Sequence, residues 1–194
     1  MASKEKSTIK RIAQWNRRGA KSALKMIMEY CYRHQINAFL LNETKLTPDD
    51  RISIPPYRIY RTDRSLNRGG GSAILVHPTL HPIRMGGYLP HRNAEEVVVK
   101  IKIGRKHLLL ITWYSATPDY TSNSLKTFLS QFDLPKIIMG DFNAHSRAWG
   151  SDRTCQWGHQ IDKLLADAEY RLMNDGRATY VRAPAYESCL DLTK

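Results

Sequence analysis

Apolar runs of strand length, each closed by a polar residue or a turn signal, constrain the fold of this chain most strongly. Such runs are typical of strands that are buried on both faces. Three of them are expected at residues 37–41, 72–76 and 136–139. Two further runs flank Gly104 and Arg105, a short turn signal, so residues 96–103 and 106–114 are expected to form a hairpin.

Helical and further strand segments lie between these runs. Apolar residues recur at helical spacing over residues 20–34, and further helices are expected at residues 121–132 and 159–168. Short strands are expected at residues 8–15, 179–182 and 189–192. Helices that alternate with buried strands and a hairpin predict an α/β sandwich with mixed sheets.

Length and cysteine content narrow the class of protein. The 194 residues suit one domain, since a domain holds roughly 150 residues. Cys31, Cys155 and Cys189 are widely spaced and odd in number, which argues against a disulfide framework and a zinc knuckle and fits a reducing compartment. No apolar run reaches the roughly 18 residues of a membrane span, and the lysine-rich start lacks the apolar stretch of a secretory signal. We expect an intracellular, soluble domain.

Positive charge is the unusual feature of the composition, with a formal net charge of +12 at pH 7. Residues 1–110 hold 21 Lys and Arg against 8 Asp and Glu, whereas residues 111–194 hold 9 against 10. A solubilising surface is one explanation, and a polyanionic partner such as nucleic acid or an anionic membrane is the functional one. On the functional interpretation, a face that tracks phosphates is expected from Lys10, Arg11, Arg17, Arg18, Arg61, Arg64 and Arg68.

Acidic or amide side chains recur at the carboxyl-terminal ends of the predicted strands. Asn16 follows the first strand, Glu43 follows the second, Asp141 and Asn143 follow a middle one, and Asp191 lies in the last. Strand ends at one rim of a sandwich bring residues from distant parts of the sequence into one cleft. One or two carboxylates, with water and a substrate phosphate, suffice to hold Mg²⁺, which stabilises charge on a phosphodiester and helps to activate water.

Each of these residues also has a purely structural interpretation. Asn16 fits ordinary turn chemistry, Glu43 fits a loop, and residues 140–143 form a motif short enough to arise by chance. His145 and His159 are interpreted as surface or packing histidines rather than metal ligands. The tryptophans are interpreted as packing residues rather than base-stacking platforms: Trp15, Trp113, Trp149 and Trp157.

Several motifs, in their order along the chain, together resemble the endonuclease/exonuclease/phosphatase superfamily. They are Gln14-Trp15-Asn16, Asn42-Glu43-Thr44, Gly69 to Val76, Trp113-Tyr114 with Pro118, and Gly140-Asp141-Phe142-Asn143. Further segments are similar to the apurinic-type endonuclease domain of arthropod-type non-LTR retrotransposons: Ala144 to Ser151, Leu172 to Asn174, Thr179 to Arg182 and Ser188 to Thr193. The resemblance covers nearly the whole chain, from Ile9 to Thr193.

The resemblance implies a four-layer α/β sandwich with two mixed sheets flanked by helices. It also implies a metal-dependent endonuclease, with Mg²⁺ or Mn²⁺ as cofactor, that nicks one strand of duplex target DNA. The resulting 3′-hydroxyl would prime reverse transcription and retrotransposon insertion. The implied partners are duplex DNA and a parent polyprotein with a reverse transcriptase, the implied location is the nucleus, and an isolated domain would be monomeric and would not bind membranes.

The resemblance assigns roles to individual residues. Glu43 matches the principal metal ligand, and Asn16 matches a second residue on the metal side of the site. Tyr114 matches the tyrosine that contacts the scissile phosphate, and Asp141 the residue that aligns or deprotonates the attacking water. Asn143 matches the amide that steadies the phosphate-bound state. The chemistry agrees, since water attack on a phosphodiester needs a metal, a water-positioning base and hydrogen-bond donors to the phosphate oxygens.

Two segments depart from the family pattern. The family closes with a Ser-Asp-His segment whose histidine Asp191 would orient, and no such segment stands before Lys194. Residues 9–194 are therefore expected to be an endonuclease domain without its final strand, behind a basic and flexible N-terminus at residues 1–8. Residues 113–118 also differ, because the family more often has Asn before the tyrosine and a shorter step to the proline.

Two alternatives to the retrotransposon endonuclease stay open at this point. The first is a non-catalytic DNA-binding remnant of such a domain, which the absent Ser-Asp-His segment suggests. The second is another branch of the superfamily, an abasic-site endonuclease or a different phosphodiesterase or phosphatase.

Overall fold

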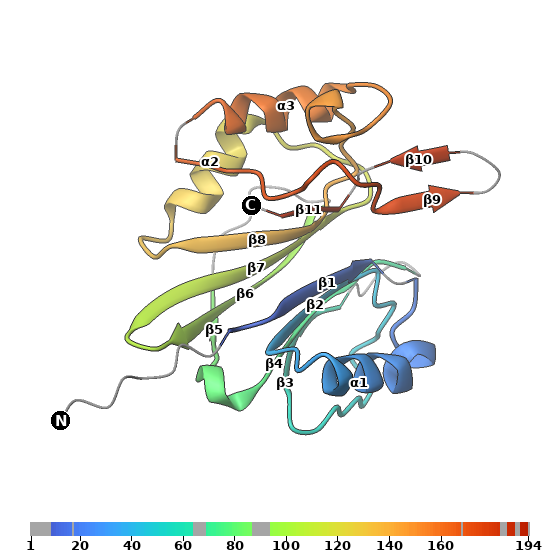
Figure 1. Cartoon of the computed structure of the whole chain (residues 1–194), viewed down its shortest axis with the longest axis vertical. Helices are drawn as coiled ribbons and strands as arrows, with labels where there is room; N and C mark the ends of the chain where they lie inside the picture. The colour runs from blue at the N-terminus through green and yellow to red at the C-terminus, as the bar shows by residue number, and fades with distance from the viewer. Residues whose placement is uncertain are drawn as a thin grey trace.

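The computed structural model is a four-layer sandwich (Figure 1). It describes residues 9–16, 18–63, 69–86, 94–167, 169–182, 186–188 and 191–193. Helix α1 (Leu24–Arg33) forms one outer layer, and helices α2 (Ser122–Ser130) and α3 (Gln156–Leu165) form the other. Two β-sheets lie between them, so the expected α/β class and its four layers are confirmed.

The first sheet has four strands in the order β1-β2-β4-β3. Their bounds are β1 Ile12–Asn16, β2 Ala38–Asn42, β3 Arg58–Thr62 and β4 Ser72–Val76. β1 and β2 are parallel, whereas β4 is antiparallel to both β2 and β3. Because β1 and β2 run in the same direction, their last residues, Asn16 and Asn42, stand opposite each other at one edge of the sheet.

The second sheet has five strands in the order β11-β8-β7-β6-β5. Their bounds are β5 Ile83–Met85, β6 Ala94–Ile103, β7 Lys106–Ser115, β8 Lys136–Asp141 and β11 Asp191–Thr193. β7 and β8 are parallel and the other pairs are antiparallel, so both sheets are mixed. A separate antiparallel pair, β9 (Tyr180–Arg182) and β10 (Tyr186–Ser188), extends beside the sandwich (Figure 1).

Alternation of side chains along the inner strands explains why their sequences are continuously apolar. In β2, Phe39 and Leu41 pack on the α1 side, whereas Ala38 and Leu40 pack against the other sheet. Successive side chains of a strand point to opposite faces, so a strand covered on both faces needs apolar residues at every position. β4 follows the same rule, with all five residues buried.

Aromatic side chains fill the space between the second sheet and its helices. Trp113 of β7 is fully buried and its ring stacks on Phe142, with centroids 5.8 Å apart. The ring of Phe128 from α2 lies 5.8 Å from that of Trp113. Each of the four tryptophans belongs to a hydrophobic cluster or packs against one, which confirms the packing interpretation: Trp15, Trp113, Trp149 and Trp157.

Several elements differ from the sequence-based expectation. Helix α3 begins at Gln156, three residues earlier than expected, because the Cys155 thiol accepts a hydrogen bond from the Gly158 amide and caps the helix. Strands β3 and β5 were not expected, since their residues are mostly half-buried or exposed and form no apolar run. Among the described residues, no helix has the length and apolar character of a membrane span.

Candidate active site

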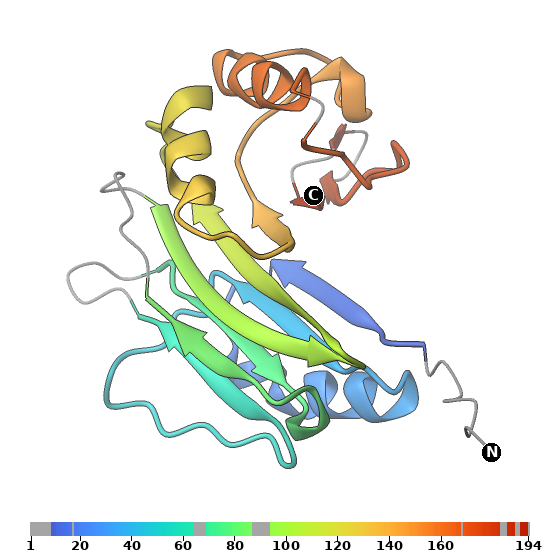
Figure 2. The same ribbon diagram turned by 90° about the vertical axis from the view of Figure 1, so that its left-hand side faces the viewer.

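The Asn16 side chain joins two carboxylates that come from different sheets. Its Nδ2 donates to Oδ2 of Asp141 at 2.6 Å and to Oε1 of Glu43 at 3.3 Å. Asn16 ends β1, Glu43 follows β2, and Asp141 ends β8. Figure 2 shows the ends of β1 and β8 meeting where the two sheets face each other. The structure therefore brings together three of the polar residues that the sequence places at strand ends.

A strained turn presents Glu43 to this cluster. Its φ angle is +52°, in the left-handed region, which costs a residue with a Cβ about 1 kcal/mol or more and is often found at functional sites. Hydrogen bonds on both sides hold the turn: the Gly19 amide donates to the Glu43 carbonyl at 2.9 Å, and the Thr44 amide donates to the Gly71 carbonyl at 3.1 Å. Because Gly71 has a φ of +87° and a Cβ there would lie 2.4 Å from Thr44 Oγ1, glycine is required at this position.

A second tight turn fixes the Asp141 carboxylate. The Asn143 amide donates to Asp141 Oδ1 at 2.8 Å, and the Asn143 side chain donates to the Ser115 carbonyl at 2.7 Å. The φ angle of Asn143 is +47°, a conformation that asparagine tolerates better than most residues. With Asn16 on Oδ2, both oxygens of Asp141 accept a hydrogen bond, and the side chain is only 5% exposed.

Tyr114 and Asp191 flank Asp141 in the second sheet. In the strand register, Tyr114 of β7 pairs with Asp141 on one side and Asp191 of β11 pairs with it on the other. Tyr114 is largely buried, at 6% exposure. The backbone thus places every residue to which the resemblance assigns a catalytic role at this rim, although the Asp191 side chain lies outside the described part of the structure.

Only part of the predicted phosphate-tracking face falls within the described residues. Arg18 is 74% exposed, and its Nε lies 3.9 Å from Oε2 of Glu43. Arg61 is largely buried and donates to the carbonyls of Thr47 and Pro48, with its Nε 3.1 Å from Asp63. Arg17, Arg64 and Arg68 lie outside the described residues. Lys10 and Arg11 precede β1, at the opposite end of this strand from Asn16.

A buried polar network beneath the cluster was not assigned a role from the sequence. Asn42 is fully buried, and the two hydrogens of its Nδ2 are shared among three acceptors: Thr112 Oγ1 at 2.9 Å, Ser72 Oγ at 3.1 Å and the Trp113 carbonyl at 3.2 Å. Its Oδ1 accepts from Gln14 Nε2 at 3.1 Å. Polar residues at inward positions of otherwise apolar strands are the signal that could have predicted this link between the sheets.

Two neighbouring glutamates of β6 lie beside this network. Glu95 is buried, and its carboxylate accepts a short hydrogen bond from the Gly71 amide in the loop that supports Glu43. Burial raises the pKa of Glu96 to about 6, with the neighbouring Glu95 charge adding to the rise and Arg84 opposing it. Glu95 pairs with Tyr114 in the strand register, so it lies next to the candidate site, whereas the side chain of Glu96 points to the opposite face of β6.

The donor set at the rim fits a hard cation. Asn16 Oδ1 is buried and accepts no hydrogen bond from any described residue. This free oxygen stands beside the carboxylates of Glu43 and Asp141, and carboxylate and amide oxygens with water are the ligands that Mg²⁺ prefers. Within the described ranges, no three His, Cys, Asp or Glu side chains cluster to form a closed cage. The fit is that of an open site completed by water and substrate.

Comparison with known proteins agrees with the fold. Residues 108–194 match the family described as endonuclease-reverse transcriptase. The fold is similar to the endonuclease domain of TRAS1, a telomere-specific non-LTR retrotransposon, with a TM-score of 0.74 and 22% identity over 95% of this chain and 83% of that one. It is also similar to an endonuclease/exonuclease/phosphatase family protein from Leptotrichia buccalis, with a TM-score of 0.67 and 11% identity over 95% of this chain and 87% of that one.

In part of its sequence and in its fold, the chain is similar to endonucleases of the endonuclease/exonuclease/phosphatase type. Among curated relatives, it is 24% identical over 176 residues to the RNA-directed DNA polymerase from mobile element jockey of Drosophila melanogaster. That match covers 88% of this chain but 19% of the relative, so the chain spans about a fifth of the relative's length. The similarity to retrotransposon proteins that the motifs indicated is thus confirmed.

Proposed function

We propose that this chain is a metal-dependent endonuclease domain that nicks one strand of duplex DNA and leaves a 3′-hydroxyl to prime reverse transcription of a retrotransposon. The observation that carries the proposal is the meeting of Glu43 and Asp141 on the Asn16 amide. Hydrolysis of a phosphodiester needs a base to position water and oxygen ligands for a cation, and this cluster supplies both.

The turn that follows β8 is proposed to position the attacking water and the phosphate. Asp141 is the group proposed to orient and deprotonate the attacking water, because the Asn143 and Asn16 hydrogen bonds hold its carboxylate in one orientation. The Asn143 side chain donates one amide hydrogen to the Ser115 carbonyl, and its second amide hydrogen can bind a phosphate oxygen. Tyr114, in register with Asp141, is proposed to contact the same phosphate.

Glu43 and Asn16 are the proposed metal ligands. The buried, unpartnered Asn16 Oδ1 supports this role, because a buried oxygen without a hydrogen bond is costly unless a ligand engages it. When bound, Mg²⁺ or Mn²⁺ would neutralise the negative charge that develops on the phosphodiester. Arg18, largely exposed beside Glu43, supplies a second positive charge for the DNA backbone.

Duplex DNA, the nucleus and a longer parent protein complete the proposal. The basic excess of residues 1–110 favours a polyanionic substrate, and chromosomal DNA is the duplex that a retrotransposon must reach. The curated relatives are RNA-directed DNA polymerases of which this chain spans about a fifth. We therefore propose a parent polyprotein in which a reverse transcriptase extends the primer that this domain makes.

A plasmid-nicking assay tests the proposal. Supercoiled plasmid is incubated with Mg²⁺, Mn²⁺ or EDTA and the wild-type chain, Asp141→Asn or Glu43→Gln. We expect a metal-dependent conversion to open circles that falls about 10²- to 10³-fold in both variants, the usual cost of removing a base or an electrostatic group. Matched controls are Asp133→Asn and Glu29→Gln, since both carboxylates are exposed and distant from the rim.

The outcomes separate the alternatives. Equal nicking by the wild type and both site variants would refute the assignment of these residues. Salt-sensitive binding of duplex DNA without nicking in either metal would replace the enzyme by the non-catalytic DNA-binding alternative. Preferential cleavage of a duplex with an abasic site would assign the chain to that branch of the superfamily. Thermal stabilisation by Mg²⁺ that Glu43→Gln abolishes would support the ligand assignment independently of turnover.

A further inference from the structure

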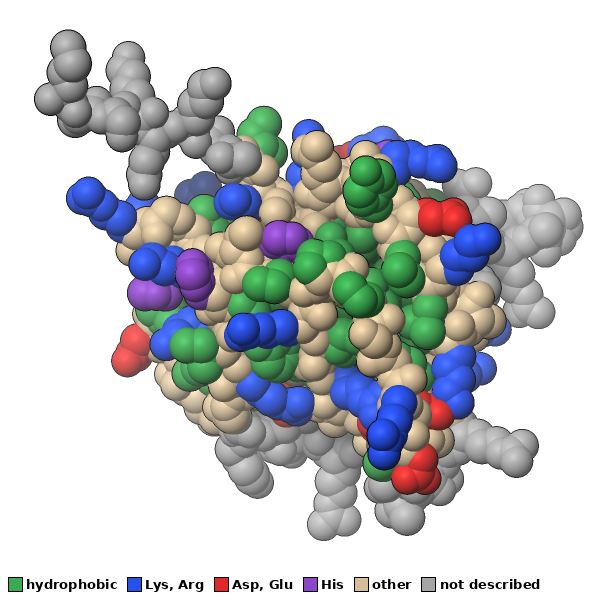
Figure 3. Space-filling view, turned by 90° about the horizontal axis from the view of Figure 1, so that it is seen from below, with side chains coloured by type: hydrophobic (Ala, Val, Ile, Leu, Met, Phe, Trp, Pro, Cys, Tyr) green, Lys and Arg blue, Asp and Glu red, His purple; other side chains and the backbone are tan. Residues whose placement is uncertain are grey.

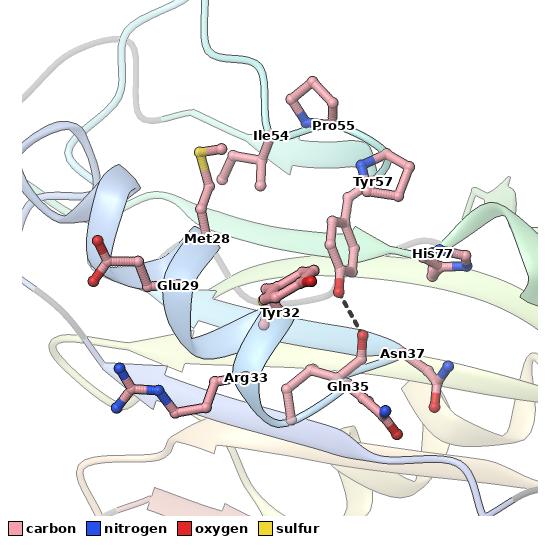
Figure 4. A pocket seen from close by; sticks show the side chains of 13 residues that line it. Met28, Glu29, Tyr32, Arg33, Gln35, Asn37, Ile54, Pro55, Tyr57 and His77 are labelled. Atoms are coloured by element: carbon pink, nitrogen blue, oxygen red, sulfur yellow. Dashed lines mark hydrogen bonds between the residues drawn. The ribbon is translucent and has the colours of Figure 1, made fainter.

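A groove lies between helix α1 and the loop that precedes β3 (Figure 4). Its volume is about 910 Å³. Asn37, which lines it, stands directly before β2, whereas Glu43 directly follows that strand, so roughly 20 Å of extended chain separates the groove from the candidate active site. We call it the α1 groove, and its principal lining residues are Met28, Tyr32, Ile54, Pro55, Tyr57 and His77.

The inner walls of the α1 groove are preformed. The Tyr57 hydroxyl donates to the Ile36 carbonyl at 2.5 Å, and its ring meets that of His77 edge-on, with centroids 5.7 Å apart. Burial, together with the neighbouring Cys31, raises the pKa of Tyr57 to about 12, so the hydroxyl stays a neutral donor. Ile54 and Cys31 are buried beneath it. A ligand that binds here would therefore lose little conformational entropy in these walls.

Exposed apolar side chains of α1 form part of the outer wall of the groove. Seven large hydrophobic side chains are exposed in the described part of the chain, and four of them lie on α1: Met26, Met28, Tyr30 and Tyr32. Tyr32 is 90% exposed at the edge of the groove. Figure 3 shows apolar surface gathered on this side of the molecule with Lys, Arg and His around it. Met28 and Tyr32 are four residues apart on α1, so they lie on the same side of the helix and both line the groove, whereas Met26 and Tyr30 lie on the other side. A solvated helix surface is normally polar, so the exposed Met28 and Tyr32 are typical of a docking surface.

A basic pocket continues the α1 groove past the end of the helix. It has a volume of about 650 Å³ and shares Arg33, Gln35 and Ile36 with the groove. Its basic lining residues are Lys10, Arg11 and Arg33, His34 also lines it, and no Asp or Glu does. Neither Lys10 nor Arg33 forms an ion pair with a described carboxylate. The apolar groove and the basic pocket therefore form one continuous surface with two chemical characters.

We propose that this surface binds a peptide segment of a partner protein in which apolar side chains are followed by acidic ones. The apolar residues would occupy the α1 groove, and the carboxylates would face Arg33 and Lys10 in the basic pocket. Glu29 lines the groove and disfavours phosphate there. The Tyr30 ring already contacts the rings of His34 and Phe39, at 4.4 and 5.9 Å, which leaves it poorly placed to stack on a base. A peptide therefore fits better than a nucleic acid.

Selection from a random 16-residue peptide library displayed on phage tests the proposal on the full chain. We expect enriched peptides to contain two or more large apolar residues next to a run of Asp or Glu. The Kd of a labelled, enriched peptide is then measured by fluorescence anisotropy. Tyr32→Ser and Arg33→Glu should each raise this Kd at least tenfold, and because both side chains are exposed, circular dichroism should stay unchanged.

Lys163→Glu is the matched control. Lys163 is exposed in the last turn of α3, as Arg33 is in the last turn of α1, and the control should change the Kd by less than twofold. Three results would overturn the proposal. The first is that the wild-type chain enriches no peptide over a double variant with Tyr32→Ser and Arg33→Glu, and the second is that the enriched peptides are neutral or basic. The third is that a 16-nucleotide single strand displaces the labelled peptide at a lower concentration than the unlabelled peptide does. The inference does not depend on the proposed function, so wild-type nicking by Tyr32→Ser is expected.

Discussion

Replacement of Asn42 by leucine should destabilise the junction between the two sheets. The side chain is fully buried and makes four hydrogen bonds, with Gln14 and Ser72 in the first sheet and with Thr112 and Trp113 in the second. Each buried hydrogen bond contributes about 1 kcal/mol net, and the apolar surface of leucine recovers part of the loss. We expect the free energy of unfolding to fall by about 3 kcal/mol, which lowers Tm by roughly 6–12 °C for a chain of this size.

Urea denaturation followed by tryptophan fluorescence measures this change. The control is Asn123→Leu, because Asn123 is exposed on α2, and its free energy of unfolding should stay within about 0.5 kcal/mol of wild type. Asn42 directly precedes Glu43, and the side-chain amide of Asn42 donates to the carbonyl of Trp113, which directly precedes Tyr114. Because both neighbours belong to the candidate site, the nicking rate should fall as well. A wild-type midpoint and slope for Asn42→Leu would refute the idea that this network holds the sheets together.

Two further changes probe the site from other directions. Gly140→Ala places a Cβ 1.8 Å from the Trp113 carbonyl oxygen, so it should separate β7 from β8. In thermal melting, the free energy of unfolding should fall by at least about 3 kcal/mol. The control is Gly86→Ala, where no atom lies within 4 Å of the new Cβ and the free energy of unfolding should fall by about 0.5 kcal/mol or less. The raised pKa of Glu96, about 6 against 4.5, gives a stabilising contribution that is complete below pH 4.5 and is lost as pH rises through 6. Glu96→Gln should therefore match wild type near pH 4 and be more stable, by up to about 1 kcal/mol, near pH 8 in denaturant titrations; a wild-type curve at both pH values would contradict the burial argument.

The sequence predicted best the elements whose burial is uniform. Residues 72–76 form β4 as expected, because every position is buried and the apolar run is unbroken. β3 could not be predicted from the apolar pattern, since Ile59 and Tyr60 stand between arginines and none of its five residues is fully buried. The start of α3 was missed because the residue that caps it is Cys155, whereas Ser, Thr, Asp and Asn are the usual signals at that position.

The sequence predicted which residues form the candidate site but not which of them contact one another. Polar residues after buried strands identified Asn16, Glu43 and Asp141, yet nothing in the pattern shows that one amide touches both carboxylates across 125 residues of chain. The link that Asn42 makes to Thr112 spans 70 residues and depends on how the two sheets pack face to face. Contacts of this kind follow from tertiary packing, which local spacing does not encode.

The two sheets divide the chain into consecutive halves. Every strand of the first sheet lies between residues 12 and 76, and every strand of the second lies between residues 83 and 193. Glu43 belongs to the first half and Asp141 to the second, so neither half alone carries both carboxylates. During synthesis the first part of the chain emerges first, and with it Glu43 but not Asp141. On the proposed function, the site exists only where the two sheets pack against each other, so its assembly requires both parts of the chain to fold.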